Sequence, residues 1–119
     1  MSQTIIDSQK AFIFPGQGAQ VVGMGKQIYD ESSSVQRVFE QADDILGFSL
    51  SKLCFEGPQE ELTMTYNAQP AIFTVSVAGL TYLKERSAAF EECPAFVAGH
   101  SLGEYSALVA AGAIKFQEA

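Results

Sequence analysis

Residues 99–103 of the chain read G-H-S-L-G, and they set how the elements on either side are arranged. The apolar run A-F-V-A over residues 95–98 precedes it, and a helical pattern over residues 102–111 follows it. A strand, a sharp turn centred on a serine and a helix together form the nucleophile-elbow pattern G-x-S-x-G. Glycine on either side lets the strand and the helix pass closely, because a Cβ atom would collide there. The pattern therefore predicts that Ser101 lies at the tip of a turn between a strand and a helix.

The chemistry available to Ser101 depends on its neighbours. A serine hydroxyl is a weak nucleophile, so it must be held clear of the backbone and near a base. A helix that begins just after it offers free N–H groups and a partial positive charge, which can stabilise the oxyanion of a tetrahedral intermediate. His100 is the only histidine, but the adjacent position on a sharp turn directs its side chain away from the serine. We expect His100 to be a structural or orienting residue and not the base. The five-residue pattern alone is also compatible with an ordinary glycine-rich turn.

A second glycine-rich stretch lies near the start of the chain. Residues 11–14 form a short apolar run, which predicts a buried strand of a parallel sheet. Residues 16–20, G-Q-G-A-Q, follow as a tight loop. A dinucleotide-binding loop would need glycine where Val21 stands, and a phosphate-binding P-loop would need glycine where Gln20 stands. Both nucleotide-binding patterns therefore fail, and the loop predicts no cofactor.

Helical patterns occupy most of the chain between the two glycine-rich stretches. The serines at residues 32–34 can cap a helix with one apolar face, and Gly47 can end it. Shorter helical pieces are expected near residues 50–55 and 59–62. The longest helix is expected to begin at residues 67–70 with its proline in the first turn, where a missing N–H costs nothing.

These elements predict an α/β fold in which strands at residues 11–14 and 95–98 form a parallel sheet with helices packed around it. Residues 1–10 are expected to form an N-terminal tail, and residues 11–119 a single unit. The helix over residues 102–111 is expected to bury its larger apolar side chains, namely Leu102, Tyr105, Leu108 and Val109.

Composition narrows the class of protein. The chain has 119 residues, of which 47% are hydrophobic and 18% charged, as expected for one small globular unit. Its net charge of -7 argues against a nucleic-acid-binding protein. Cys54 and Cys93 are far apart and match no zinc-binding spacing, so free thiols in a reducing compartment are expected. An acidic linker is expected over residues 87–94. With no signal-peptide pattern and no apolar run of membrane-spanning length, a cytoplasmic location is expected.

Two motifs together carry a family resemblance. Residues 14–20, F-P-G-Q-G-A-Q, and residues 99–108, G-H-S-L-G-E-Y-S-A-L, resemble the malonyl-CoA:acyl carrier protein transacylases of fatty-acid and polyketide synthesis. Residues 67–71, N-A-Q-P-A, also resemble that family. The resemblance covers nearly the whole chain after the first ten residues.

The resemblance implies a two-step acyl transfer. Ser101 would take a malonyl group from malonyl-CoA, and the phosphopantetheine thiol of an acyl carrier protein would then receive it. Backbone N–H groups of Gln17 and Leu102 would hold the oxyanion. An aliphatic residue at Leu102 also favours malonyl over methylmalonyl in related synthase domains. No cofactor or metal is implied.

The resemblance also implies that the chain is incomplete. The family's catalytic histidine, and the arginine that pairs with the malonyl carboxylate, lie beyond the position of Ala119. The chain is therefore expected to be the N-terminal part of a hydrolase-like acyltransferase domain, nearly inactive without the remaining C-terminal part. The alternative is that a second polypeptide carries that part and complements this chain. Two alternatives stay open: a serine hydrolase or thioesterase with the same elbow, and a non-catalytic fragment that binds carrier protein.

Overall fold

The computed structural model describes residues 6–86 and 93–119. Two strands, β1 (Ile6–Phe14) and β2 (Cys93–Gly99), form a parallel pair. The remaining elements are helices: α1 (Lys26–Glu31), α2 (Ser33–Leu46), α3 (Leu50–Glu56), α4 (Gln59–Thr63), α5 (Thr65–Arg86), α6 (Gly103–Ala110) and the 3-10 helix η2 (Phe116–Glu118). The predicted α/β class, with a parallel sheet and surrounding helices, is confirmed. The expected acidic linker lies mostly outside the described residues.

The register of the two strands determines which chain segments lie side by side at the end of the sheet. Phe14, the last residue of β1, is paired with Gly99, the last residue of β2. The two chain segments that follow these strands therefore leave the sheet at the same end. The strand expected at residues 11–14 begins earlier, so residues 6–10, expected in a tail, extend β1. Because residues 6–10 are mostly polar, the search for an apolar run did not predict this part of the strand.

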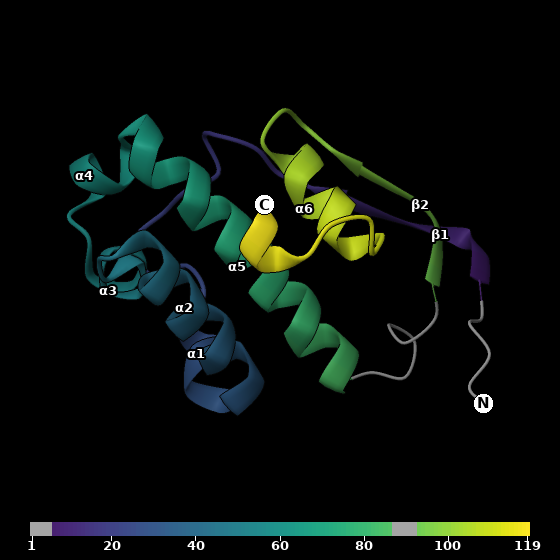
Figure 1. The fold of residues 1–119 in the computed structure, drawn as a ribbon, viewed down its shortest axis with the longest axis horizontal. Coiled ribbons are helices and arrows are strands. Elements are labelled where there is room, and N and C mark those ends of the chain that lie inside the picture. The colour runs from purple at the N-terminus through teal and green to yellow at the C-terminus, as the bar shows by residue number, and fades with distance from the viewer. Residues whose placement is uncertain (1–5, 87–92) are drawn as a thin grey trace.

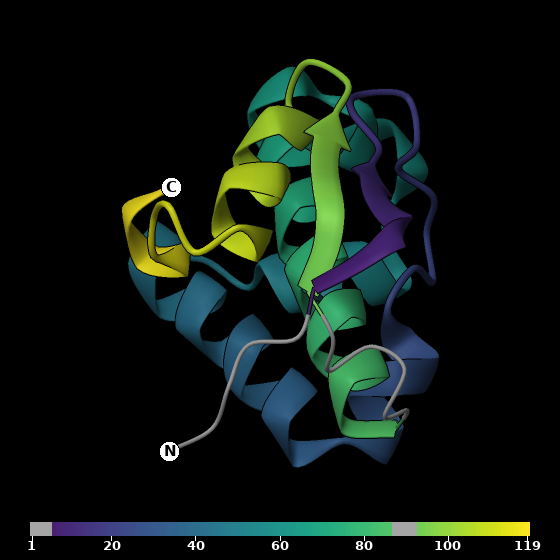
Figure 2. The same cartoon turned by 90° about the vertical axis from the view of Figure 1, so that its right-hand side faces the viewer.

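Helix α5 runs through the middle of the molecule (Figure 1). It contacts α6 on one side and each of the helices α1 to α4 on the other. Helix α6 contacts both strands, so it joins the sheet to the helical part of the fold (Figure 2). The other face of the sheet is open, because Ile13 is 78% exposed and Phe96 is 74% exposed. The sheet thus has one covered face and one open face.

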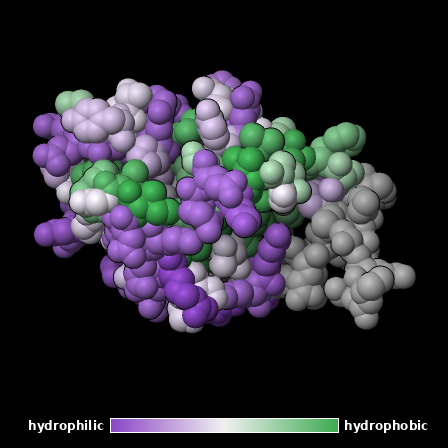
Figure 3. Space-filling model, viewed as in Figure 1, coloured by the Kyte–Doolittle hydropathy of each residue, from purple (hydrophilic) through white to green (hydrophobic). Residues whose placement is uncertain are grey.

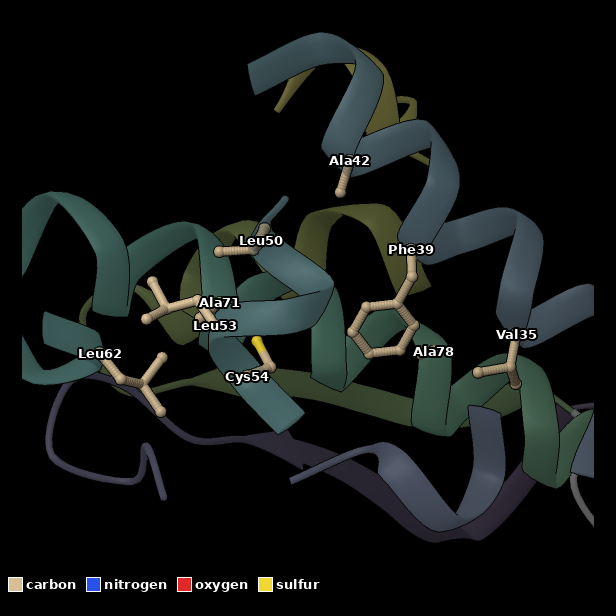
Figure 4. Close-up of a cluster of buried hydrophobic side chains, with 9 residues drawn as sticks. All are labelled: Val35, Phe39, Ala42, Leu50, Leu53, Cys54, Leu62, Ala71 and Ala78. Carbon is tan, nitrogen blue, oxygen red and sulfur yellow. The ribbon is translucent and has the colours of Figure 1, made fainter. Parts of the chain in front are cut away.

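The hydrophobic core lies among the helices (Figure 4). Its buried members come from α2, α3, α4 and α5, and they are Val35, Phe39, Ala42, Leu50, Leu53, Cys54, Leu62, Ala71 and Ala78. The ring of Phe39 meets that of Tyr29 edge-on, with centroids 5.6 Å apart, and lies 5.1 Å from that of Phe55. Burial raises the pKa of the Cys54 thiol to about 12, and the nearby Asp43 acts in the same direction. Cys54 is therefore a core residue with an unreactive thiol.

The caps of α2 form as predicted, whereas the start of α5 differs. Ser32 accepts a hydrogen bond from the N–H of Val35, and Gly47 ends the helix with a φ of 78°. Helix α5 begins at Thr65, so Pro70 is its sixth residue and not part of its first turn. Pro70 leaves the carbonyl of Tyr66 without its helical partner. Tyr66 itself is 73% exposed, so this interruption lies in a solvent-exposed turn of the helix.

Helix α6 buries a different face from the one expected. Its buried residues are small ones: Gly103, Ser106 and Ala107. Of the expected core residues, Tyr105 is 50% exposed and Leu108 is 43% exposed, while Leu102 and Val109 are half-buried. Hydrophobic side chains accordingly gather over α6 on the face shown in Figure 3. The expectation was wrong because the helix approaches the sheet so closely that only small side chains fit between them.

Candidate functional site

Ser101 occupies a strained turn between β2 and α6. Its φ is 54°, and among the described residues no other non-glycine residue has a positive φ. The left-handed region costs an L-residue about 1–2 kcal/mol, so the surrounding structure must impose it. Two hydrogen bonds close the turn, from the N–H of Gly103 to the carbonyl of His100 (3.0 Å) and from the N–H of Glu104 to that of Ser101 (3.0 Å). Ser101 remains exposed. The predicted strand, turn and helix are all present.

Three glycines let the backbone segments around Ser101 touch. A Cβ atom on Gly99 would lie 2.0 Å from the carbonyl carbon and oxygen of Gly103. A Cβ atom on Gly103 would lie 2.3 Å from the carbonyl oxygen of Phe14. A Cβ atom on Gly16 would lie 2.2 Å from the carbonyl oxygen of His100. Any side chain at these positions would therefore push apart β1, the turn and α6.

The contact of Gly16 with His100 joins the two glycine-rich stretches. The N–H of His100 also donates to the carbonyl of Phe14 over 3.1 Å, which continues the pairing of β1 and β2 into the turn. Gln17 follows Gly16, and Ser101 follows His100. Segments that lie far apart in the sequence thus place Gln17 and Ser101 at the same end of the sheet.

The side chain and the backbone of Gln17 have different surroundings. Its side-chain Nε2 donates to Oγ1 of Thr65, at the start of α5, over 3.0 Å. Within the described part of the chain, the backbone N–H groups of Gln17 and Leu102 donate to no other group. Both N–H groups belong to the segments that meet at this end of the sheet, and an oxyanion site needs backbone donors that are not already paired. Their assignment to that role stays a prediction.

His100 lies on the side of the turn that faces the glycine loop. Its Nδ1 is 3.3 Å from the point that a Cβ atom on Gly16 would occupy. In the described ranges, the hydroxyl of Ser101 has no hydrogen-bond partner, so the His100 ring makes no hydrogen bond to it. The expectation that His100 is a structural or orienting residue stays a prediction.

A groove begins beside the turn and runs between α2, α5, α6 and η2. Its volume is about 530 Å³, and its lining includes Leu102, Tyr105 and Phe73. The ring of Phe116 stacks on that of Phe73, with centroids 5.1 Å apart and planes at 6°. Leu102 thus links this largely apolar groove to the strained turn.

Thr65 is a site neighbour that sequence reasoning missed. No spacing rule relates a threonine at the start of one helix to a glutamine 48 positions earlier. The described residues contain no group of three or more His, Cys, Asp or Glu side chains placed to hold a metal ion. None of the helices in the described ranges is long and apolar enough to cross a membrane.

A parallel strand pair, a strained serine between strand and helix, and a glycine loop packed beside it define an α/β protein of the serine-elbow class. The chain belongs to the acyl transferase domain family, whose family model matches residues 11–119.

Two related proteins show how much of the chain is shared with known transacylases. The malonyl CoA-acyl carrier protein transacylase of Bacillus subtilis (strain 168) is 55% identical over 112 residues, which cover 94% of this chain and 34% of the relative. The solved acyl-carrier-protein-S-malonyltransferase of Bartonella henselae is 48% identical with a TM-score of 0.84, over 91% of this chain and 34% of that one.

A third comparison is with a complex. A malonyl-transacylase solved with its type II polyketide acyl-carrier protein is 41% identical with a TM-score of 0.82, over 97% of this chain and 35% of that one. The chain spans about a third of the length of these relatives.

Proposed function

We propose that this chain supplies the nucleophile and the oxyanion-binding loop of a malonyl-CoA:acyl carrier protein transacylase. Residues 11–119 are then the N-terminal portion of its acyltransferase domain. The observation that carries the proposal is the left-handed Ser101, with a φ of 54°, beside a glycine loop whose Gly16 touches the neighbouring His100. The malonyl substrate and the carrier-protein partner are supported by the names of the relatives.

The proposed reaction has two balanced steps. Ser101 Oγ attacks the thioester carbonyl of malonyl-CoA, the Oγ–C bond forms, and the C–S bond to coenzyme A breaks with protonation of the thiol. The phosphopantetheine thiol of an acyl carrier protein then attacks the serine ester. A new C–S bond forms, the C–O bond breaks, and Ser101 recovers its proton. Both tetrahedral intermediates carry an oxyanion, which the N–H groups of Gln17 and Leu102 stabilise.

The chain alone is expected to acylate slowly. No described residue contacts the hydroxyl of Ser101 as a base. A serine without its base keeps only the part of the rate that oxyanion stabilisation and binding supply. A malonyl carboxylate also requires a paired cation when it is partly buried. Both groups would come from the remaining part of the domain.

A hybrid protein tests the proposal directly. Residues 1–119 are joined to the part of the Bacillus subtilis relative that follows its matched region, and malonyl transfer to an acyl carrier protein is measured by mass spectrometry. We expect the hybrid to form a malonyl-serine at Ser101 and to transfer it, and the Ser101→Ala variant to do neither. Hydrolysis of malonyl-CoA at the same rate with and without carrier protein would contradict the proposal and favour a hydrolase.

A further inference from the structure

The side chain of Gln59, at the start of α4, holds two backbone groups of the segment that follows the glycine loop. Its Oε1 accepts a hydrogen bond from the N–H of Val22 over 2.8 Å. Its Nε2 donates to the carbonyl of Gln20 over 3.3 Å and to Oγ1 of Thr63 over 3.2 Å. One carboxamide thus pairs with a donor and an acceptor two residues apart. Neither a carboxylate nor an apolar side chain can make both bonds.

The segment that Gln59 contacts, residues 20–23, connects the glycine loop to the helices. The N–H of Gly23 donates to the carbonyl of Cys54 over 2.7 Å. The side chain of Val22 packs against the hydrophobic core, and a Cβ atom on Gly57 would lie 2.9 Å from its Cγ2. Residues 20–23 are therefore anchored on α3, α4 and the link between them.

The loop itself is connected to this anchor through Gln20. The side-chain Oε1 of Gln20 accepts a hydrogen bond from the N–H of Gly18 over 2.7 Å. Gly18 has a φ of 109°, and nothing lies within 4 Å of a Cβ atom built on it, so packing does not fix the middle of the loop. At the other end, Gly16 is fixed by its contact with His100. The position of Gln17 between these ends therefore depends on hydrogen bonds, among them the bond from its own side chain to Thr65.

We propose that Gln59 is a positioning residue, which fixes the far end of the Gly16–Gln20 loop and thereby directs the backbone N–H of Gln17 toward the oxyanion. This inference rests on the function proposed above. Loss of the Gln59 amide frees the carbonyl of Gln20 and the N–H of Val22 to bond with water. The loop then samples positions in which the Gln17 N–H is misdirected. Substrate binding by the rest of the site is unaffected.

The first test uses amide hydrogen exchange to measure how well the loop is held in the 119-residue chain. Gln59→Leu removes both backbone contacts, and Gln59→Glu removes only the donor. Gln36→Leu is the matched control, because Nε2 of Gln36 donates to the carbonyl of Tyr29 over 2.9 Å at a site away from the loop. We expect the Val22 amide to exchange about fivefold faster in Gln59→Leu, as the loss of one hydrogen bond implies. In Gln59→Glu we expect it to keep its protection, and in Gln36→Leu to show no change.

The second test measures malonyl transfer in the hybrid protein. We expect Gln59→Leu to lower kcat several-fold with an unchanged KM for malonyl-CoA, because an oxyanion contact acts in the transition state alone. We expect Gln36→Leu to leave both constants unchanged. Unchanged exchange of Val22 in Gln59→Leu would overturn the inference, and so would faster exchange with an unchanged kcat. Transfer that survives Ser101→Ala would instead overturn the proposed function.

Discussion

The sharpest prediction concerns Gly99, whose replacement by alanine should displace α6 from the sheet. A Cβ atom there would lie 2.0 Å from the carbonyl carbon and oxygen of Gly103 and 2.3 Å from the N of Glu104. All three are backbone atoms, so no side-chain rotation relieves the overlap. Ordinary contact begins near 3.4 Å, and the backbone must therefore move by roughly 1.4 Å. Overpacking of this kind costs about 1–3 kcal/mol of folding free energy.

Urea unfolding of the chain, followed by circular dichroism, measures that cost. With a urea dependence of about 1–3 kcal/mol per M, the midpoint should fall by about 1 M. Gly79→Ala is the matched control, because Gly79 lies within α5 and a Cβ atom there meets nothing within 4 Å. Alanine at that position should stabilise the chain by about 0.5–1 kcal/mol.

The same shift should separate Ser101 from the glycine loop. In the hybrid protein, a misplacement of about 1 Å can lower the acylation rate by about a hundredfold. A Gly99→Ala variant with the stability and acylation rate of the parent protein would refute the reasoning. It would mean that Gly99 of β2 and Gly103 of α6 are not in backbone contact.

Four further predictions concern three residues, Ser101, Cys54 and Phe39. Ser101→Gly should abolish acylation yet raise the free energy of unfolding by about 1 kcal/mol, since glycine adopts a positive φ without strain; an unchanged or lower urea midpoint would count against the strained turn. Cys54, with a thiol pKa raised from 9.0 to about 12, should resist iodoacetamide at pH 8 until the chain unfolds, as peptide mapping can show, and rapid labelling of the folded chain would contradict its burial. The pKa of the Cys54 thiol is higher in the folded chain than in the unfolded chain, so the thiol stabilises the fold fully below pH 9.0. This contribution should disappear as the pH rises toward 12. The urea midpoints of the parent protein and of Cys54→Ala should therefore converge over that pH range. Phe39→Ala should lower the free energy of unfolding by about 3–5 kcal/mol, because the Phe39 side chain is fully buried and its ring packs against those of Tyr29 and Phe55. A urea midpoint within error of the parent would show that this core is not close-packed.

The sequence was most informative where backbone sterics restrict which residues can occupy a position. A glycine, a serine and a second glycine between a strand and a helix predict the turn, because steric overlap excludes other residues there. Parallel pairing then explains why the loop after β1 reaches Ser101. Both inferences depend on local patterns and on general rules of chain geometry.

Other features depend on contacts that no local pattern encodes. Gln59 reaches Val22 across 37 positions of sequence, and nothing in the spacing of polar residues reveals such a bond. The buried face of α6 was mispredicted because hydrophobicity favoured Tyr105 and Leu108. Their exposure follows from the small distance that Gly103 permits between α6 and the end of β1, a tertiary property.

The order of the elements has a kinetic consequence. Helices α1 to α5 are consecutive in sequence and form their core through short connections, whereas β1 and β2 pair only after the ends of a long intervening segment meet. Closure of that segment carries the larger entropy cost. We therefore expect Ser101 and Gln17 to come together late during folding, and to separate early when the chain begins to unfold.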